Sequence, residues 1–205
     1  MFTDKLILIT GSTGSWGQEL TKQLLEMNPK KIIIFSRGEL AQVNMERKFM
    51  SDKLEFVIGD VRDANAVDRL FNNKQIDCVF HLAALKHVPV CENQPQEAIK
   101  TNIIGTTNLV NSAVKYKVKK FIDVSTDKAV SPTNLYGFTK AVGEKIVIQA
   151  NNLSNCTDFV CIRGGNVLGS NGSVVPLFID QIKKFNKITL TYGGMTRFFL
   201  TLSEA

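Results

Sequence analysis

The stretch Thr10-Gly11-Ser12-Thr13-Gly14-Ser15-Trp16-Gly17 decides how this chain folds. It directly follows an apolar run at 6–9 and opens an amphipathic segment with leucines at 20, 24 and 25. Gly11 permits a tight turn, Gly14 lets the backbone approach a pyrophosphate closely, and Gly17 lets a helix pack against a strand. The start of that helix presents free N–H groups and a positive dipole end to phosphates. We therefore expect a dinucleotide to be bound by the loop residues Gly11, Thr13, Gly14, Ser15, Trp16 and Gly17.

Five further apolar runs repeat the pattern along the chain, at 32–35, 54–58, 78–80, 121–124 and 159–162. These runs are continuous rather than alternating, which is typical of strands buried on both faces. Amphipathic segments separate them. Strands that alternate with helices imply right-handed crossovers, so the sequence predicts an α/β fold with a Rossmann-like, doubly wound parallel sheet. Ligands of such sheets bind beyond the carboxyl ends of the strands.

The pattern loosens after about residue 165, where glycines become frequent. A helix is predicted at 174–187 and a short strand at 188–191. We expect residues 1–165 to form a cofactor-binding domain and residues 166–205 to begin a small substrate-binding region. The apolar residues Phe198, Phe199 and Leu200 then have little to pack against. This suggests a chain truncated within its substrate domain.

Composition and charge exclude several classes of protein. The 205 residues carry a net charge of +6 and are 44% apolar, as in a globular domain and unlike a dedicated nucleic-acid binder. No apolar stretch approaches the roughly 18 residues of a membrane span, and no signal peptide is apparent, so a cytoplasmic protein is expected. The four cysteines lack zinc-site spacing, so we expect reduced thiols and no metal site.

Residues at the ends of the second and third runs bear on cofactor choice. In Phe35-Ser36-Arg37-Gly38-Glu39, Ser36 and Arg37 are positioned to bind a ribose 2′-phosphate, which favours NADP. Glu39 lies near enough to bind the ribose instead, which leaves NAD as the alternative. In Gly59-Asp60-Val61, Asp60 either accepts from the adenine amino group or caps a helix that starts at Arg62.

Tyr136 and Lys140 form a YxxxK pair on one face of a predicted helix. A tyrosine with a pKa of about 10 is a poor base at neutral pH, and a neighbouring ammonium lowers that pKa. Tyr136 is thus expected to exchange a proton with a substrate hydroxyl while hydride moves to nicotinamide.

The fifth run ends in Val124-Ser125-Thr126-Asp127-Lys128. Thr126 is placed to hydrogen-bond the reacting hydroxyl. Asp127 and Lys128 add a second acid–base pair, which a dehydratase needs and a simple alcohol dehydrogenase does not. The alternative interpretation of this pair is a loop salt bridge.

Six motifs together resemble the extended short-chain dehydrogenase/reductases, and more closely the UDP-N-acetylglucosamine 4,6-dehydratases of polysaccharide and flagellin-glycan synthesis. They are the glycine loop, HLAALKHVP (81–89), STDK (125–128), NLYGFTK (134–140), NVLGSNGSVVP (166–176) and MTRFF (195–199). The resemblance implies a UDP-sugar substrate and a homo-oligomer. It implies further cofactor-binding residues, namely Val61, Leu82, Ala83, Ala84 and Asn102, of which Asn102 is also expected to hold the active-site backbone and a water molecule. It implies substrate-binding residues, namely Lys86, Asn166, Val174, Thr196 and Arg197.

The resemblance also implies a mechanism. Tyr136, assisted by Thr126 and Lys140, takes the 4-hydroxyl proton while C4 gives up hydride. Lys128 then removes the C5 proton, Asp127 protonates the departing 6-hydroxyl, and hydride returns to C6. A lysine at 128, where retaining enzymes usually carry glutamate, resembles the C5-inverting subgroup.

Two alternatives stay open. One is a 4-epimerase or ketoreductase that uses only Thr126, Tyr136 and Lys140, and the other is a non-catalytic nucleotide-binding fragment. His81 and His87 are interpreted as packing and hydrogen-bonding residues.

Overall fold

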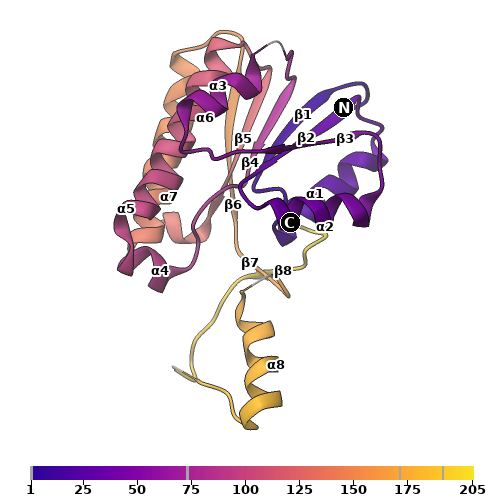
Figure 1. Ribbon diagram of the computed structural model, residues 1–205. Coiled ribbons are helices and arrows are strands. Elements are labelled where there is room, and N and C mark those ends of the chain that lie inside the picture. The colour runs from indigo at the N-terminus through magenta and orange to yellow at the C-terminus, as the bar shows by residue number, and fades with distance from the viewer. Residues whose placement is uncertain (1, 73, 171, 191) are drawn as a thin grey trace.

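The computed structural model describes residues 2–72, 74–170, 172–190 and 192–205. Its main feature is a six-stranded sheet of order β3-β2-β1-β4-β5-β6 in which every pair is parallel (Figure 1). Chain order reverses between β1 and β4, which creates a crevice at the carboxyl ends of the strands. The strands are β1 (Leu6–Thr10), β2 (Lys31–Ser36), β3 (Leu54–Ile58), β4 (Cys78–His81), β5 (Lys120–Thr126) and β6 (Asp158–Gly164).

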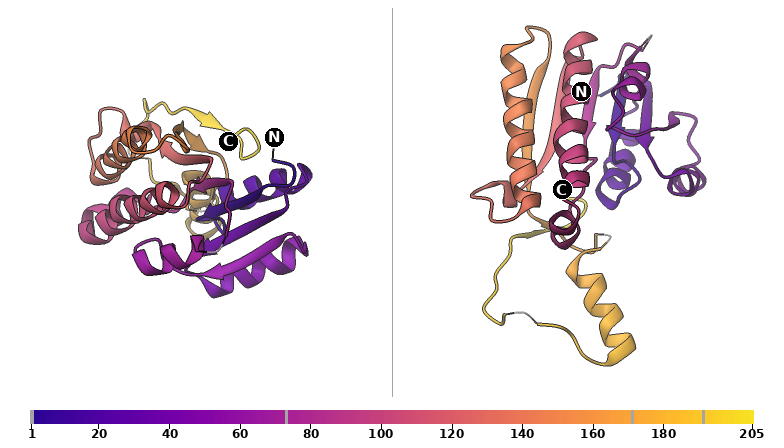
Figure 2. Two further views of the ribbon diagram at one scale, coloured as in Figure 1. Left: turned by 90° about the horizontal axis from the view of Figure 1, so that it is seen from above. Right: turned by 60° about the vertical axis from the view of Figure 1, so that its left-hand side comes forward.

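Helices cover both faces of this sheet (Figure 2). One face packs against α1 (Ser15–Glu26) and α2 (Glu39–Phe49), and the other against α3 (Ala64–Phe71), α6 (Gly105–Lys115) and α7 (Leu135–Gln149). Successive strand residues pack into the hydrophobic cores on opposite faces of the sheet, because side chains alternate across a strand. In β1, Ile7 and Ile9 enter the core under α1 and α2, whereas Leu8 enters the other. The predicted α/β doubly wound parallel sheet is confirmed, with each of the six apolar runs forming a strand.

Short elements connect β4 to α6 and follow β5. The chain after β4 forms α4 (Val88–Asn93) and α5 (Pro95–Ile99), and then a π-helical turn, η1 (Lys100–Ile104), that runs directly into α6. A 3₁₀ turn, η2 (Asp127–Ala129), follows β5, and another, η3 (Ala150–Asn152), follows α7. π-Helical turns occur frequently at functional sites, and η1 lies beside the cavity described below.

The last forty residues form a smaller unit. β7 (Asn166–Val167) pairs in parallel with β8 (Phe199–Leu200), and α8 (Val174–Phe185) projects away from the sheet (Figure 1). α8 ends two residues earlier than the predicted 174–187, because Asn186 adopts a left-handed conformation with φ of 50°. The strand predicted at 188–191 is wrong for residues 188–190, which form no strand, and Thr191 lies outside the described residues.

Candidate active site

A cavity of about 800 Å³ opens at the carboxyl ends of the strands, as the doubly wound fold predicts. It brings together most of the predicted site residues. These are Gly11, Thr13, Gly14, Ser15, Trp16, Gly17, Ser36, Arg37, Asp60, Val61, Leu82, Ala83, Ala84, Lys86, Thr126, Lys128, Tyr136, Lys140, Asn166, Val174 and Arg197. Three predicted residues, Asn102, Asp127 and Thr196, are not among its lining residues.

The glycine loop is crowded in the way that the sequence predicts. Gly11 has a φ of +68°, and a Cβ there would lie 2.7 Å from the backbone nitrogen of Ala83. A Cβ on Gly17 would lie 2.5 Å from Cα of Ser12. Gly14 is the N-cap of α1, and the first turn of α1 contains no acidic residue. The loop thus leaves bare backbone and the positive end of a helix facing the cavity, which suits the phosphates of a dinucleotide.

Arg37, just after β2, and Asp60, just after β3, lie close together at the wall of the cavity. The Arg37 guanidinium lies 3.8 Å from the Asp60 carboxylate. Burial opposes ionisation of Asp60, but hydrogen bonds from Arg62, one of them 2.7 Å long from Nε, outweigh burial and lower the pKa of Asp60. The alternative role of Asp60 as a helix cap is wrong, because α3 begins at Ala64 and Asp63 caps it by accepting from two backbone amides.

Tyr136 and Thr126 meet at the centre of the cavity. Tyr136 lies in the first turn of α7, whose N-cap Asn134 accepts a 2.9 Å bond from the Gly137 amide. Burial raises the pKa of Tyr136, a hydrogen bond with Thr126 lowers it, and the Asp127 charge raises it again. The net direction is upward.

The predicted lowering of the Tyr136 pKa by Lys140 is therefore not seen. Nζ of Lys140 bonds the carboxylate oxygens of Asp123, at 3.2 and 3.3 Å. Both side chains are interior, with exposed fractions of 3% for Lys140 and 0% for Asp123. The carboxylate neutralises the ammonium that the phenol was expected to use. Sequence reasoning missed Asp123, although a carboxylate inside the apolar run Phe121–Val124 signals a buried partner.

Asp127 and Lys128 form a close acid–base pair at the start of η2. Nζ of Lys128 lies 2.9 Å from Oδ1 of Asp127 and 3.3 Å from Oδ1 of Asn166 in β7. Oδ1 of Asp127 also accepts a 3.0 Å bond from the Thr126 hydroxyl. Burial opposes ionisation of Asp127, but the bonds from Lys128 and Thr126 outweigh it and lower its pKa. Lys128 lines the cavity, and Asp127, which is not among the lining residues, has a side chain of similar exposure, 35% against 34% for Lys128.

The remaining predicted substrate residues come from two segments. Lys86 lies in the loop after β4, where partial burial lowers its pKa. Val174 and Arg197 line the cavity from the smaller unit. The guanidinium of Arg197 donates to the backbone carbonyl of Thr196 at 2.6 Å, and the side chain of Thr196 does not reach the cavity wall.

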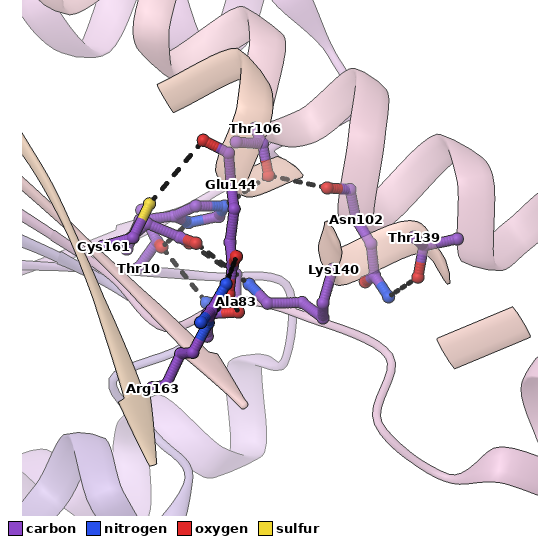
Figure 3. A network of polar contacts seen from close by, with 12 residues as sticks. Thr10, Ala83, Asn102, Thr106, Thr139, Lys140, Glu144, Cys161 and Arg163 are labelled. Carbon is purple, nitrogen blue, oxygen red and sulfur yellow. Dashed lines mark hydrogen bonds and ion pairs between the residues drawn. The ribbon is translucent and has the colours of Figure 1, made fainter. Parts of the chain in front are cut away.

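Asn102 lies behind the cavity, on η1. Its side chain accepts from the backbone N–H of Leu85 at 2.8 Å and donates to the Leu85 carbonyl at 2.9 Å. It also donates to the hydroxyl of Thr139 at 3.0 Å, a contact visible in Figure 3. Asn102 therefore ties the loop after β4 to α7, which is a supporting position rather than a cofactor contact.

Several lining or supporting residues were not predicted. A Cβ on Gly164 would lie 2.6 Å from the Trp16 ring, so the indole occupies the space that a side chain at 164 needs. Arg163 and Glu144 form a two-bond ion pair at 2.7 and 3.0 Å, which ties β6 to α7 (Figure 3). These contacts join residues far apart in the chain, and no local motif announces them.

The described residues contain neither a membrane-spanning helix nor a cluster of metal ligands. None of the helices in the described part of the chain has the length and apolarity needed to cross a membrane. Within 2–72, 74–170, 172–190 and 192–205, no group of three or more His, Cys, Asp or Glu side chains is arranged to hold a metal ion. The thiols of Cys78 and Cys91 are buried, and burial raises the pKa of each.

Comparisons with known proteins agree with this geometry. The chain is 47% identical to a UDP-N-acetylglucosamine 4,6-dehydratase (inverting) of Campylobacter jejuni, over all of this chain and 62% of the relative. It is 44% identical to a UDP-glucose 4-epimerase of Rickettsia canadensis, over all of this chain and 61% of that relative. The solved structure of Pen from Bacillus thuringiensis matches with a TM-score of 0.95 and 43% identity, covering all of this chain and 65% of Pen.

The chain thus spans about three fifths of the length of the curated relatives that it matches. The family described as "Polysaccharide biosynthesis protein" matches residues 7–205, which is nearly the whole chain. With the glycine loop, the Tyr136–Lys140 helix and the parallel sheet in place, this chain belongs to the polysaccharide biosynthesis protein family.

Proposed function

We propose that this chain carries the cofactor site and much of the catalytic site of an NADP-dependent UDP-N-acetylglucosamine 4,6-dehydratase of surface polysaccharide or glycan synthesis. The observation that carries the proposal is that Lys128, paired with Asp127, faces the same cavity as Tyr136. A dehydratase needs one proton-transfer group at the C4 hydroxyl and another acid–base pair at C5 and C6. An epimerase or ketoreductase needs only the first.

The residues around the cavity fit a nicotinamide dinucleotide. The bare backbone of the loop from Gly11 to Gly17 would hold the phosphates, and Asp60 would accept from the adenine amino group. Arg37 lines the cavity. Glu39 instead lies in the first turn of α2, where the helix dipole stabilises a negative charge. This arrangement favours NADP over NAD. When bound, the nicotinamide accepts hydride from C4 and returns it to C6.

Tyr136 acts on the C4 hydroxyl. Thr126 hydrogen-bonds the phenol and is placed to bond the reacting hydroxyl as well. The raised pKa of Tyr136 keeps the phenol protonated in the cofactor-free chain, so deprotonation of Tyr136 depends on a bound positive charge close by. Lys140, held by Asp123, lines the cavity beside Tyr136 and would assist it there.

Asp127 and Lys128 share one transferable proton across 2.9 Å. In the ionised pair the proton is on Lys128. For Lys128 to act as a base its ammonium must become more acidic, which further burial by the bound substrate or the nearby Lys140 charge would achieve. Transfer of the proton to Asp127 then gives a neutral amine and a carboxylic acid. The amine then removes the C5 proton, which the new C4 ketone has acidified, and Asp127 protonates the 6-hydroxyl. The C6–O bond breaks, water leaves and a C5–C6 double bond forms, which is saturated by hydride at C6 and a proton at C5.

Product analysis in deuterated water tests the proposal. The protein is incubated with NADP⁺ and UDP-N-acetylglucosamine, and the nucleotide sugars are analysed by mass spectrometry and NMR. We expect a 4-keto-6-deoxy product with deuterium at C5, and an inverted C5 configuration because Lys128 stands where retaining enzymes carry glutamate. Release of a 4-epimer with no loss of water would overturn the proposal.

A second candidate is a sugar-nucleotide 4-epimerase, which the name of the Rickettsia relative supports. It predicts that Asp127→Asn and Lys128→Met leave turnover nearly unchanged, whereas the dehydratase proposal predicts that both collapse it. A third candidate, a non-catalytic nucleotide-binding fragment, predicts tight NADPH binding with no turnover by this 205-residue chain.

A further inference from the structure

A continuous run of hydrogen bonds connects the cavity wall to the helix that carries Tyr136. It begins at the backbone N–H of Ala83, which donates to the Thr10 hydroxyl at 3.3 Å. The Thr10 hydroxyl lies 2.7 Å from Nδ1 of His81. Nε2 of His81 lies 2.9 Å from the hydroxyl of Thr106 on α6. The run therefore crosses from the end of β1 to α6 through a buried imidazole.

The run continues from α6 through η1 to α7 (Figure 3). The Thr106 hydroxyl donates to the backbone carbonyl of Asn102 at 2.7 Å. The Asn102 side chain donates to the Thr139 hydroxyl at 3.0 Å, and that hydroxyl donates to the backbone carbonyl of Tyr136 at 2.9 Å. The last acceptor thus belongs to the residue that carries the phenol. Thr10, His81, Thr106, Asn102 and Thr139 are all buried.

The directions of these bonds determine which ring nitrogen of His81 carries the proton. If Nε2 is protonated, it donates to Thr106, and Thr10 donates to the bare Nδ1, so that every hydroxyl proton has an acceptor. If Nδ1 is protonated instead, Thr10 accepts twice and its own proton has no acceptor among the described residues. Thr106 must then donate to Nε2, and its 2.7 Å bond to the Asn102 carbonyl is lost. A buried polar group left unpaired costs about 1–3 kcal/mol, so the first arrangement prevails.

We infer that His81 is a positioning residue and that its ring is neutral and protonated on Nε2. In this form it fixes α7, the helix that carries Tyr136, relative to β1, the strand that precedes the glycine loop. Its influence passes through Thr106, Asn102 and Thr139, and it touches neither substrate nor cofactor. The inference of a tautomer rests on the hydrogen bonds alone. Only its kinetic consequence rests on the proposed function.

Nitrogen NMR tests the tautomer directly. The chain contains two histidines, so a His87→Gln sample assigns the imidazole signals of ¹⁵N-labelled protein. We expect His81 to show a protonated Nε2 and a bare Nδ1 at neutral pH. In Thr106→Val, Nε2–H loses its acceptor while Thr10 still donates to Nδ1, so the proton should stay on Nε2 and the Nε2–H signal should shift to that of a ring N–H without a hydrogen bond. Thr106→Ser keeps the hydroxyl and should restore the wild-type pattern.

Thr107→Val is the matched control. Thr107 neighbours Thr106 on α6 and makes the same kind of bond to a carbonyl four residues back, at 2.8 Å to Ile103, but it is no part of the run. We expect Thr107→Val to leave the Nε2–H signal of His81 unchanged. In turnover of UDP-N-acetylglucosamine, Thr106→Val should lower kcat about five- to tenfold with KM unchanged, and Thr107→Val should lower neither.

Two results would overturn the inference. One is a wild-type His81 protonated on Nδ1, and the other is an Nε2–H signal that Thr106→Val leaves unchanged. If the protein proves to have another activity, the nitrogen signals still decide the tautomer, so failure of the proposed function is distinguishable from failure of this inference.

Discussion

The Lys140–Asp123 pair offers a prediction whose magnitude follows from burial. Both charges lie in the interior, with Asp123 fully buried in β5 and Lys140 only 3% exposed. Removing one partner of such a pair leaves an uncompensated buried charge, which costs about 3–5 kcal/mol. We therefore expect Asp123→Asn to lower the free energy of unfolding by about that amount, a large share of the roughly 5–15 kcal/mol that stabilises a typical domain.

The double variant Asp123→Asn/Lys140→Met separates the ion pair from general packing. Because neither charge remains, we expect it to be more stable than either single variant, so that the two single costs do not add. The assay is urea unfolding followed by circular dichroism, with the midpoints compared at equal m-values. Asp180→Asn is the control, since Asp180 pairs with Lys184 at 3.0 Å on the surface and should cost less than about 1 kcal/mol.

A cost below about 1 kcal/mol for Asp123→Asn would refute this reasoning. So would a double variant whose loss equals the sum of the two single losses. Either result would mean that Lys140 does not depend on Asp123 for its place beside Tyr136.

Four further predictions follow from the same coordinates. Gly11→Ala should destabilise the chain far more than Gly169→Ala. Both glycines have φ near +70°, but a Cβ at 11 would clash with backbone atoms, whereas nothing lies within 4 Å of a Cβ at 169. Equal losses of stability in thermal unfolding would contradict the crowding at Gly11. Arg37→Ser should weaken NADP⁺ binding at least tenfold in calorimetry and leave NAD⁺ binding nearly unchanged; an equal loss for both cofactors would remove Arg37 from 2′-phosphate recognition. Burial lowers the pKa of His81 from 6.5 to about 4, so as the pH falls the unfolded chain binds a proton at this residue before the folded chain does. The contribution of His81 to the free energy of unfolding should be full above about pH 6.5 and decline by roughly 2–3 kcal/mol towards pH 4.5. In urea titrations, the free energy of unfolding of His81→Phe should decrease less over the same pH range. Sedimentation velocity should detect the proposed homo-oligomer as a species at least twice the 22.8 kDa mass of the chain, and a single monomeric boundary at micromolar concentration would argue against it.

The fold was predictable because its evidence is local. Continuous apolar runs mark strands buried on both faces, and the glycine loop between the first run and the first helix defines the phosphate end of the sheet. The cavity followed from the same pattern, since loops after parallel strands gather at one edge. Tyr136, Thr126 and Lys128 meet there because each lies at or just after the end of a strand, or in the first turn of the helix that follows.

What sequence reasoning missed depends on partners distant in the chain. Spacing placed Lys140 on the same helix face as Tyr136, but it does not reveal that Asp123 binds the ammonium from inside β5. Asn102 was expected both to hold the active-site backbone and to bind the cofactor; its side chain does bond the backbone of Leu85, but it also bonds Thr139 and does not line the cavity. The strand predicted at 188–191 was wrong for a different reason. A β-prone segment forms a strand only when another strand is available to pair with it, and β7 pairs with β8 instead.

The central claim is that Tyr136 acts in oxidation at C4 and the Asp127–Lys128 pair in loss of water. Lys128→Met tests this claim most directly, with the surface variant Lys183→Met as control. The variant is mixed with NADP⁺ and UDP-N-acetylglucosamine while nicotinamide absorbance and sugar mass are followed. Oxidation at C4 needs Tyr136 and not Lys128, so we predict that reduced nicotinamide accumulates while no water is lost from the sugar. A Lys128→Met protein that still forms the 4-keto-6-deoxy product at the rate of the control would contradict the account.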